Sequence, residues 1–295
     1  MRAIYRKLPG VAIAVVAFAI GLGFVTAAAQ EPEKDKMKAK LKSMKERTFC
    51  GDNNWSHNGR ESVSELREAT IPARSTITVD GRQNGGINIK GDDRSDILVR
   101  ACVQAWGESA EAAKSELSGI KVNTAGTIKA ESGDDNRWSV SFELIVPRPS
   151  NVNLTARNGG ISIYGIDGNA EFVTQNGGVF LSDVAGNFKG RTTNGGVYVK
   201  LFGSSWKGSG LDVTTTNGGV NIHLPENYAA NIETGTVNGG FSTDIAALKQ
   251  PRDETDDKWQ HRPVKINTNL NGGGPSVRIV TTNGGVRISN SPSKE

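Results

Sequence analysis

The sequence predicts a mainly β protein: a β-solenoid of repeats about 18 to 23 residues long, with an N-terminal β-rich cap that contains one short helix. The triplet Asn-Gly-Gly occurs eight times, and apolar and polar residues alternate on both sides of most copies. Glycine accounts for 36 of the 295 residues without a collagen triplet, which is typical of a β protein rich in turns.

The first residues have the form of a secretory signal. Arg2 and Lys7 precede the apolar run VAIAVVAFAIGLGFV, and small residues lead up to Ala29 and the polar Gln30. This order predicts a signal peptide over residues 1–29 and an extracytoplasmic mature protein, either secreted or held in the periplasm or cell envelope. An uncleaved anchor is the alternative, because about 15 to 18 apolar residues are short for a tilted membrane span but sufficient.

Residues 30–49 follow as a charged linker, which we interpret as a solvated spacer. The chain has 35 Lys and Arg against 31 Asp and Glu, so its net charge of +4 is small. Mixed charge together with secretion argues against a nucleic-acid partner. Contact with a membrane is expected only through the signal or anchor segment.

Cys50 and Cys102 are the only cysteines. Two cysteines in a secreted chain predict a disulfide, and two separately buried thiols are the alternative. Neither cysteine has a histidine at metal-ligand spacing, so we predict no metal site and no cofactor.

Residues 50–150 are less regular than the rest and predict the cap. The segments ATIPARSTITVDG, GGINIKG, DILVRACVQAWG and RWSVSFELIVP have strand patterns, and Glu108–Gly119 has the pattern of a short helix. A stack of strands exposes unpaired edges at its ends, so this region is expected to cover the first repeat. An independent small β domain is the alternative.

The repeat region covers residues 151–290 and is followed by a tail, 291–295. Successive copies of the triplet from Asn158 are 18, 18, 23 and 21 residues apart. Alternation on each side of the asparagine predicts two half-buried strands per repeat, joined at the Asn-Gly corner. The regular corners are expected at Asn158, Asn176, Asn194, Asn217, Asn238 and Asn283.

Asparagine and glycine suit such a corner because both tolerate the left-handed backbone conformation, and the second glycine is expected to let neighbouring backbones approach. In a β-solenoid, equivalent asparagine side chains form a hydrogen-bonded ladder. An antiparallel β-meander, in which each Asn-Gly is a type I′ hairpin, fits the same alternation. We favour the solenoid because near-identical repeats stack like on like.

The string of Asn-Gly-Gly-Val/Ile-x-Val/Ile units, joined by links such as YGIDGNAEF and LSDVAGNFKG, resembles the bacterial putative-adhesin family of β-strand repeat proteins. The resemblance covers roughly residues 150–290, with a partial copy around Asn84. It implies a β-helix-like architecture and, by analogy only, a role at the cell surface. The family is a domain of unknown function and supplies no catalytic residues to transfer.

Motifs of catalysis are scarce, and we predict that the protein is not an enzyme. The sequence contains no paired-histidine zinc helix, no phosphate loop and no G-x-S-x-G elbow. The alternative is a polysaccharide-processing enzyme on the same scaffold, with Asp167 and Asp183 as its carboxylates. Both follow an apolar strand in adjacent repeats. The acidic segment between Ile245 and Val264 is interpreted as a solvated loop.

Phe180 and Tyr198 occupy the same outward position in successive repeats, and Trp206 lies in the following loop. Exposed aromatic side chains suit the flat apolar faces of sugars or a partner strand, so these three are the candidate binding residues. A pair that only stabilises its own sheet face is the alternative.

The expected function is a non-enzymatic, adhesin-like binding protein or structural scaffold of the cell envelope, with a glycan or a protein as partner. An envelope-stress accessory protein is a further alternative, and the sequence assigns no oligomeric state.

Overall fold

The computed structural model describes residues 49–51, 60–133, 137–249 and 263–291. The predicted signal peptide, nearly all of the linker and the acidic part of the loop before Val264 lie outside these residues. Contacts divide the chain into two units, Met1–Thr48 and Phe49–Glu295, and all of the described residues belong to the second unit.

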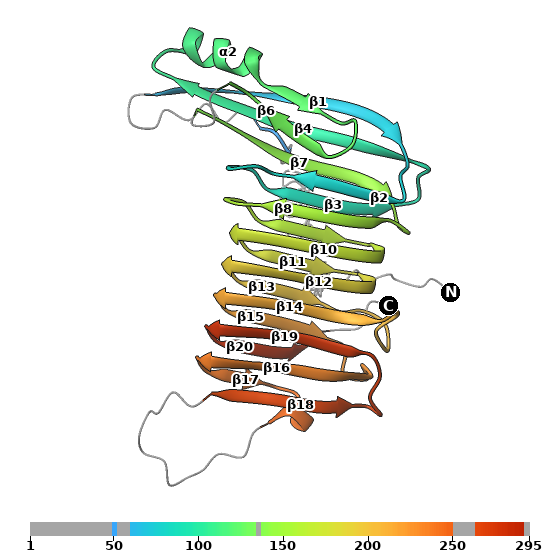
Figure 1. The fold of residues 1–295 in the computed structure, drawn as a ribbon. Coiled ribbons are helices and arrows are strands. Elements are labelled where there is room, and N and C mark those ends of the chain that lie inside the picture. The colour runs from blue at the N-terminus through green and yellow to red at the C-terminus, as the bar shows by residue number, and fades with distance from the viewer. Residues whose placement is uncertain (1–48, 52–59, 134–136, 250–262, 292–295) are drawn as a thin grey trace, which may run out of the picture. The chain divides into compact units, whose positions relative to one another are not determined.

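The unit is mainly β, and its strands form two mixed sheets of ten strands each (Figure 1). Hydrogen-bonded neighbours in the first sheet follow the order β1 (Glu61–Pro72), β4 (Asp96–Gly107), β7 (Trp138–Pro147), β3 (Ile87–Asp92), β9 (Ile161–Tyr164), β11 (Val179–Ser182), β13 (Val197–Lys200), β15 (Val220–Leu224), β20 (Val286–Asn290) and β17 (Phe241–Thr243). The second sheet follows the order β18 (Val264–Leu270), β16 (Ala230–Asn238), β19 (Ser276–Asn283), β14 (Gly210–Asn217), β12 (Ala185–Asn194), β10 (Asp167–Asn176), β8 (Asn151–Ala156), β2 (Thr76–Asp80), β6 (Ile128–Glu131) and β5 (Lys121–Asn123).

Each regular Asn-Gly-Gly joins a strand of the second sheet to a strand of the first. Strand β10 ends at Asn176, and β11 begins at Val179 in the other sheet. Neighbouring repeats pair in parallel, since Asn176 aligns with Asn194 and Phe180 with Tyr198. The antiparallel meander of type I′ hairpins is therefore wrong for the repeats, because the two strands that flank a corner do not pair with each other.

The core lies between the two sheets and consists of the alternating apolar residues. Val179, Leu181 and Val199 of the first sheet and Leu154 and Phe172 of the second are at most 2% exposed. Burial of apolar surface at about 25 cal/mol per Å² is the main force that holds the layers together. The polar residues between them point outward and are free to form surface rows.

The order of strands in space departs from their order in the chain near the last repeats. Strands β19 and β20 lie between the pair β14/β15 and the pair β16/β17, although they come last in the sequence. In addition, β18 pairs antiparallel with β16 at the end of the second sheet. The sequence spacing alone did not predict this insertion.

The predicted cap region also contributes a copy of the repeat. Strands β2 and β3 pair in parallel with β8 and β9, and Asn84 bridges to Asn158. The long strands β1, β4 and β7 extend the first sheet beyond β3. The predicted short helix is present as α2 (Ala110–Gly119), which is capped by Ser109 and contacts β4 and β1.

Cys50 and Cys102 form the predicted disulfide, with Cα atoms 5.1 Å apart. Cys102 belongs to β4, where it points away from the core on the same side as Arg100. The bond therefore fastens the segment around Cys50 to the outer face of the first sheet. A disulfide persists in oxidising compartments, so it fits an extracytoplasmic protein.

The backbone of the corners differs from the expectation. Of the described residues other than glycine, only Arg82, Asp183 and Asn271 have positive φ, so none of the six regular asparagines is left-handed. That expectation is wrong. Glycine is needed for another reason: a Cβ on Gly177 would lie 2.2 Å from the carbonyl oxygen of Gly159 in the neighbouring repeat. It is the first glycine of the triplet that makes the closest approach.

The corner asparagines form a continuous ladder along one edge of the two sheets. The side-chain amide of Asn176 donates to Oδ1 of Asn158 at 2.7 Å, and that of Asn194 donates to Oδ1 of Asn176 at 2.7 Å. The same contact runs through every neighbouring pair in the spatial order Asn84, Asn158, Asn176, Asn194, Asn217, Asn283 and Asn238.

Candidate functional site: the outer face of the first sheet

One row of outward side chains crosses the whole first sheet. The strand register aligns one outward position from each of the ten strands. In spatial order the row reads Glu68, Arg100, Glu143, Asn88, Ser162, Phe180, Tyr198, Asn221, Arg287 and Ser242. Its first part is charged and its middle is aromatic, so one face carries two kinds of surface.

The aromatic part is a column of four rings. The ring centroids of Phe180 and Tyr198 are 4.7 Å apart, and their planes differ by 8°. Tyr164 extends the column on one side at 5.0 Å from Phe180, and His223 extends it on the other at 4.9 Å from Tyr198. Tyr164 and His223 belong to the next outward row, so the column steps diagonally at each end.

The stacked geometry restricts what the column offers to a ligand. Because Phe180 and Tyr198 cover each other face to face, they present their ring edges outward. A sugar ring stacks on an aromatic face, and here those faces are already occupied. The column therefore stabilises the outer face of its own sheet, and a ligand would meet ring edges, the two phenol groups and the imidazole.

Trp206 does not belong to this surface. Its side chain is 4% exposed, its ring packs edge to face against Phe188, and its indole N–H donates to the carbonyl oxygen of Gly186 at 3.0 Å. The interpretation of Trp206 as a binding residue is therefore wrong, because the loop folds inward and the tryptophan fills the core between the sheets.

Two cations lie beside the Tyr198 and His223 end of the column. The outward side chains of β9, β11, β13, β15 and β20 include two cations, Lys200 and Arg287, and no carboxylate. The complete set of these outward side chains is Ser162, Tyr164, Phe180, Ser182, Tyr198, Lys200, Asn221, His223, Arg287 and Ser289. Desolvation, followed by repulsion from Lys200 and Arg287, lowers the pKa of His223, and Asp244 partly opposes the shift. His223 Nδ1 lies 2.9 Å from Ser289 Oγ.

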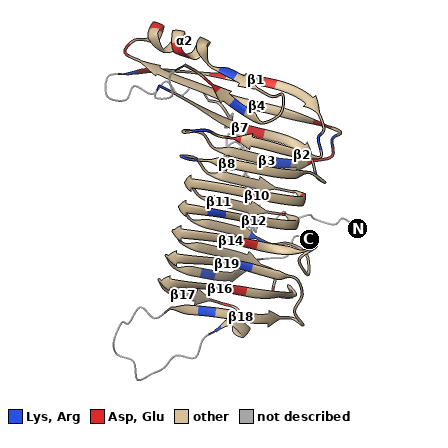
Figure 2. Cartoon of the chain, in the orientation of Figure 1, with Lys and Arg blue, Asp and Glu red and all other residues tan. Residues whose placement is uncertain are grey.

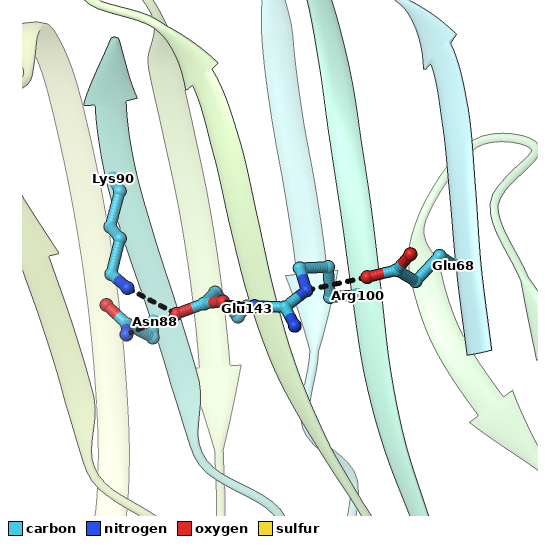
Figure 3. Close-up of polar contacts among 5 residues, drawn as sticks. All are labelled: Glu68, Asn88, Lys90, Arg100 and Glu143. Atoms are coloured by element: carbon cyan, nitrogen blue, oxygen red, sulfur yellow. Dashed lines mark hydrogen bonds and ion pairs between the residues drawn. The ribbon is translucent and has the colours of Figure 1, made fainter. Parts of the chain in front are cut away.

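The charged part of the row centres on Glu143 of β7 (Figure 3). Glu143 is 3% exposed, and its carboxylate accepts hydrogen bonds from Lys90 and Arg100 and, at 3.3 Å, from Asn88. Arg100 also donates to Glu68 at 2.8 Å. A buried carboxylate costs free energy unless it is fully paired, and this network supplies the partners.

The outer face of the second sheet is different, because its charges alternate in sign (Figure 2). The register aligns Glu171, Lys189, Asp212, Arg278 and Glu233 in that order. Arg278 bonds both of its neighbours, Asp212 at 2.7 Å and Glu233 at 3.3 Å. Within this row each charge has an opposite charge beside it, whereas the outward side chains of β9, β11, β13, β15 and β20 include cations and no carboxylate.

Asp167 and Asp183, the carboxylates of the enzymatic alternative, line one pocket of about 220 Å³ together with Arg148 and Lys207. Arg148 lies 3.7 Å from Asp183, whose φ is 56°. The pocket is at the ends of β9 and β11, away from the asparagine ladder. A wider groove of about 520 Å³ lies on the second sheet beside Gly235 and Lys265.

The described part of the chain contains no cluster of three or more His, Cys, Asp or Glu that could hold a metal ion. Within the same residues no helix is both long enough and apolar enough to span a membrane.

No protein-family model matches this chain, and no curated protein matches it significantly. Among solved structures it is similar to a "putative cell adhesion protein" from Clostridium sporogenes ATCC 15579, with 12% identity, a TM-score of 0.38, and coverage of 77% of this chain and 100% of that chain.

A "putative adhesin" from Bacteroides fragilis NCTC 9343 gives 11% identity, a TM-score of 0.31, and 77% and 97% coverage. A "putative lipid binding protein" from Parabacteroides distasonis ATCC 8503 gives 10% identity, a TM-score of 0.30, and 77% and 96% coverage. Likenesses at this level carry no argument about the activity of this chain.

Sequence reasoning placed Phe180 and Tyr198 next to each other but missed Tyr164 and His223. The sequence did contain a signal for them. In their own strands, Tyr164 and His223 lie two residues after the position that aligns with Phe180 and Tyr198, so they point outward on the same face. The network around Glu143 was also missed, because its members come from four strands with no common motif.

Proposed function

We propose that this chain is a non-enzymatic, adhesin-like binding scaffold of the cell envelope, built as a β-solenoid of Asn-Gly-Gly repeats behind an N-terminal cap. The signal-like start of the sequence and the disulfide both support an extracytoplasmic location. The binding face is the outer face of the first sheet from β9 to β20.

The observation that carries this proposal is the aromatic column with Lys200 and Arg287 beside it and no outward carboxylate on strands β9, β11, β13, β15 and β20; Asp244, just past β17, is the acid that acts on His223. The repeats beneath it are fixed by the asparagine ladder and by buried threonines such as Thr192, whose hydroxyl donates to the carbonyl oxygen of Gly177 at 2.7 Å. A rigid surface loses little conformational entropy on binding, which favours affinity.

The chemistry of this face favours an anionic glycan of the envelope. Lys200 and Arg287 attract negative charge, and the hydroxyl groups of Tyr164 and Tyr198 suit hydrogen bonds to sugar hydroxyls. Since ring faces are occupied within the column, recognition depends on charge and hydrogen bonding more than on stacking. Binding of this kind weakens as salt concentration rises.

The test is retention of the purified mature protein on cell-wall glycan and on whole cells. Replacing Lys200 and Arg287 with alanine is expected to reduce retention at least tenfold at low salt, and replacing Phe180 and Tyr198 with serine is expected to reduce it further. The control replaces Thr193 and Thr216, on the second sheet, with alanine. Unchanged retention in folded first-sheet variants would refute the binding face, and capture of a protein in place of glycan would redirect the ligand assignment.

The enzymatic alternative is favoured by one observation, that Asp167 and Asp183 line the same pocket. It predicts release of new reducing ends from an envelope polysaccharide, abolished by Asp167→Asn or Asp183→Asn. Our proposal predicts no release by the wild-type chain. An envelope-stress accessory role would instead yield one defined protein partner in a pull-down from envelope extract.

A further inference from the structure

The last two strands of the described chain fill a slot between earlier strands. Strands β19 and β20, joined at Asn283, form an arch that we call the inserted arch (Ser276–Asn290). In the second sheet it separates β14 from β16, and in the first sheet it separates β15 from β17. In the folded sheets β14 therefore reaches β16, and β15 reaches β17, only through the inserted arch.

Both walls of the slot bond this arch, and the ion pairs of Arg278 are what make the fit specific. The side chain of Asn283 donates to Asn217 and accepts from Asn238, each at 2.7 Å. Arg278 lies between Asp212 and Glu233 and bonds both, so the empty slot would place two carboxylates opposite each other. The apolar side chains of the inserted arch are at most 2% exposed; they are Val277, Ile279, Val286 and Ile288.

The arch is joined to the preceding strand by a short hinge, Asn271–Pro275. Four successive residues have positive φ: Asn271 at 47°, Gly272 at 93°, Gly273 at 81° and Gly274 at 154°. This is the irregular Asn-Gly-Gly copy of the sequence, and it does not form a corner of the ladder. Glycines adopt many conformations at similar cost, so the hinge permits more than one direction of exit.

We propose that the inserted arch is exchangeable, and that a second copy of this chain donates its own arch to the same slot. An exchanged arch would remake the hydrogen bonds, ion pairs and apolar contacts described above. Only the hinge would differ between the closed monomer and the exchanged assembly, which is the usual condition for domain swapping. Exchange would join two binding faces in one particle and raise avidity for a repetitive ligand.

The first experiment uses two full-length chains with different affinity tags, unfolded together without reductant and refolded as a mixture. Exchange predicts that purification through one tag recovers the other chain, in an amount that rises with protein concentration during refolding. Chains mixed after separate refolding are the control. Recovery equal to this control at every concentration would refute exchange.

The second experiment tests the slot itself by reversing charge. One chain carries Arg278→Glu, and the other carries Asp212→Lys with Glu233→Lys, so each chain alone has like charges around its own arch. In a reciprocally exchanged pair every arch meets opposite charges again. Co-refolding is expected to give at least tenfold more dimer, measured by light scattering, than refolding either chain alone.

A matched control replaces the first chain with Arg191→Glu, since Arg191 lies on β12 of the second sheet outside the slot. This partner is expected to give no enrichment of mixed dimer. If the charge-reversed chains do not fold alone, folding of their mixture, followed by circular dichroism, supports the proposal. A mixture that stays unfolded, or that folds only into separate monomers, overturns it. Neither readout depends on glycan retention, so the binding proposal can fail independently.

Discussion

The side-chain amide of Asn238, which ends β16, donates to Oδ1 of Asn283, which ends β19, at 2.7 Å, although the two residues are 45 positions apart and strands β17 and β18 lie between β16 and β19 in the sequence. Asn283 in turn bonds Asn217, which precedes both. The ladder thus records the order of repeats in space.

Interrupting the asparagine ladder should lower stability by a small amount. Asn176→Ala removes two side-chain hydrogen bonds, and a hydrogen bond contributes about 0.5–1.5 kcal/mol net, so we expect a loss of about 1–2 kcal/mol because water reaches these exposed amides. Urea unfolding measures this loss in the free energy of unfolding. Asn153→Ala, on the outer face of β8, is the control, and an equal loss in both variants would contradict a specific role for the ladder.

The two glycines of one triplet should differ sharply. A Cβ at Gly177 would lie 2.2 Å from the carbonyl oxygen of Gly159, whereas a Cβ at Gly178 would lie 3.3 Å from that of Gly196. Backbone shifts forced by overpacking cost about 1–3 kcal/mol, so Gly177→Ala should reach or exceed that range and Gly178→Ala should cost less. The unfolding midpoint compares them, and equal midpoints would show that close approach is not what requires glycine.

Removing the charge of Glu143 should be costly, and removing that of Glu68 should not. Glu143 is almost fully buried between Lys90 and Arg100, and the loss of one partner of a buried pair costs about 3–5 kcal/mol. Its cationic partners are partly exposed, so Glu143→Gln should fall at the lower end of this range.

Glu68 has a side chain 49% exposed, and exposed pairs contribute about 0–1 kcal/mol. Glu68→Gln is therefore the matched variant for Glu143→Gln in the same unfolding assay. A Glu143→Gln protein as stable as Glu68→Gln would mean that the network contributes no net stability.

His223 should make stability fall with acidity. Burial and the nearby Lys200 and Arg287 lower the pKa of His223 below its ordinary value of 6.5 in the folded state. The unfolded chain therefore binds the proton more readily, and the free energy of unfolding should decrease as the pH falls below about 6.5.

The measurement compares wild type with His223→Gln in denaturant titrations between pH 7.5 and pH 5. The wild type should lose more stability over this interval than the variant, because glutamine does not titrate. Parallel curves would show that the imidazole is equally easy to protonate in the folded and unfolded states.

Much of the local structure was predictable from the sequence. Alternation around Asn158 and Asn176 gave two half-buried strands per repeat, the pair Cys50 and Cys102 gave the disulfide, and the segment before Gly119 gave the helix. The left-handed corners were not found, because the pattern that marks a corner does not distinguish positive φ from close approach of backbones.

The candidate site was predictable only in part. Phe180 and Tyr198 share an outward position in neighbouring repeats, so the alternation of inward and outward residues was enough to predict that they are neighbours. Trp206 was wrongly predicted to be exposed, because the alternation of a strand does not tell which way a loop residue points. Its burial depends on the space that Phe188 leaves between the sheets. The pairing of Glu143 with Arg100 needed the antiparallel register of β4 and β7, which no repeat specifies.

By itself the sequence determined which residues face the core, where the chain turns, and that like repeats stack upon like, since these follow from side-chain alternation and from glycine at each corner. Only the tertiary structure decided the order of the stack. Any repeat offers nearly the same backbone edge and the same asparagine to any other, so local pattern cannot choose neighbours. Contacts between residues distant in the sequence decide which repeats are neighbours, such as the ion pairs of Arg278 with Asp212 and Glu233.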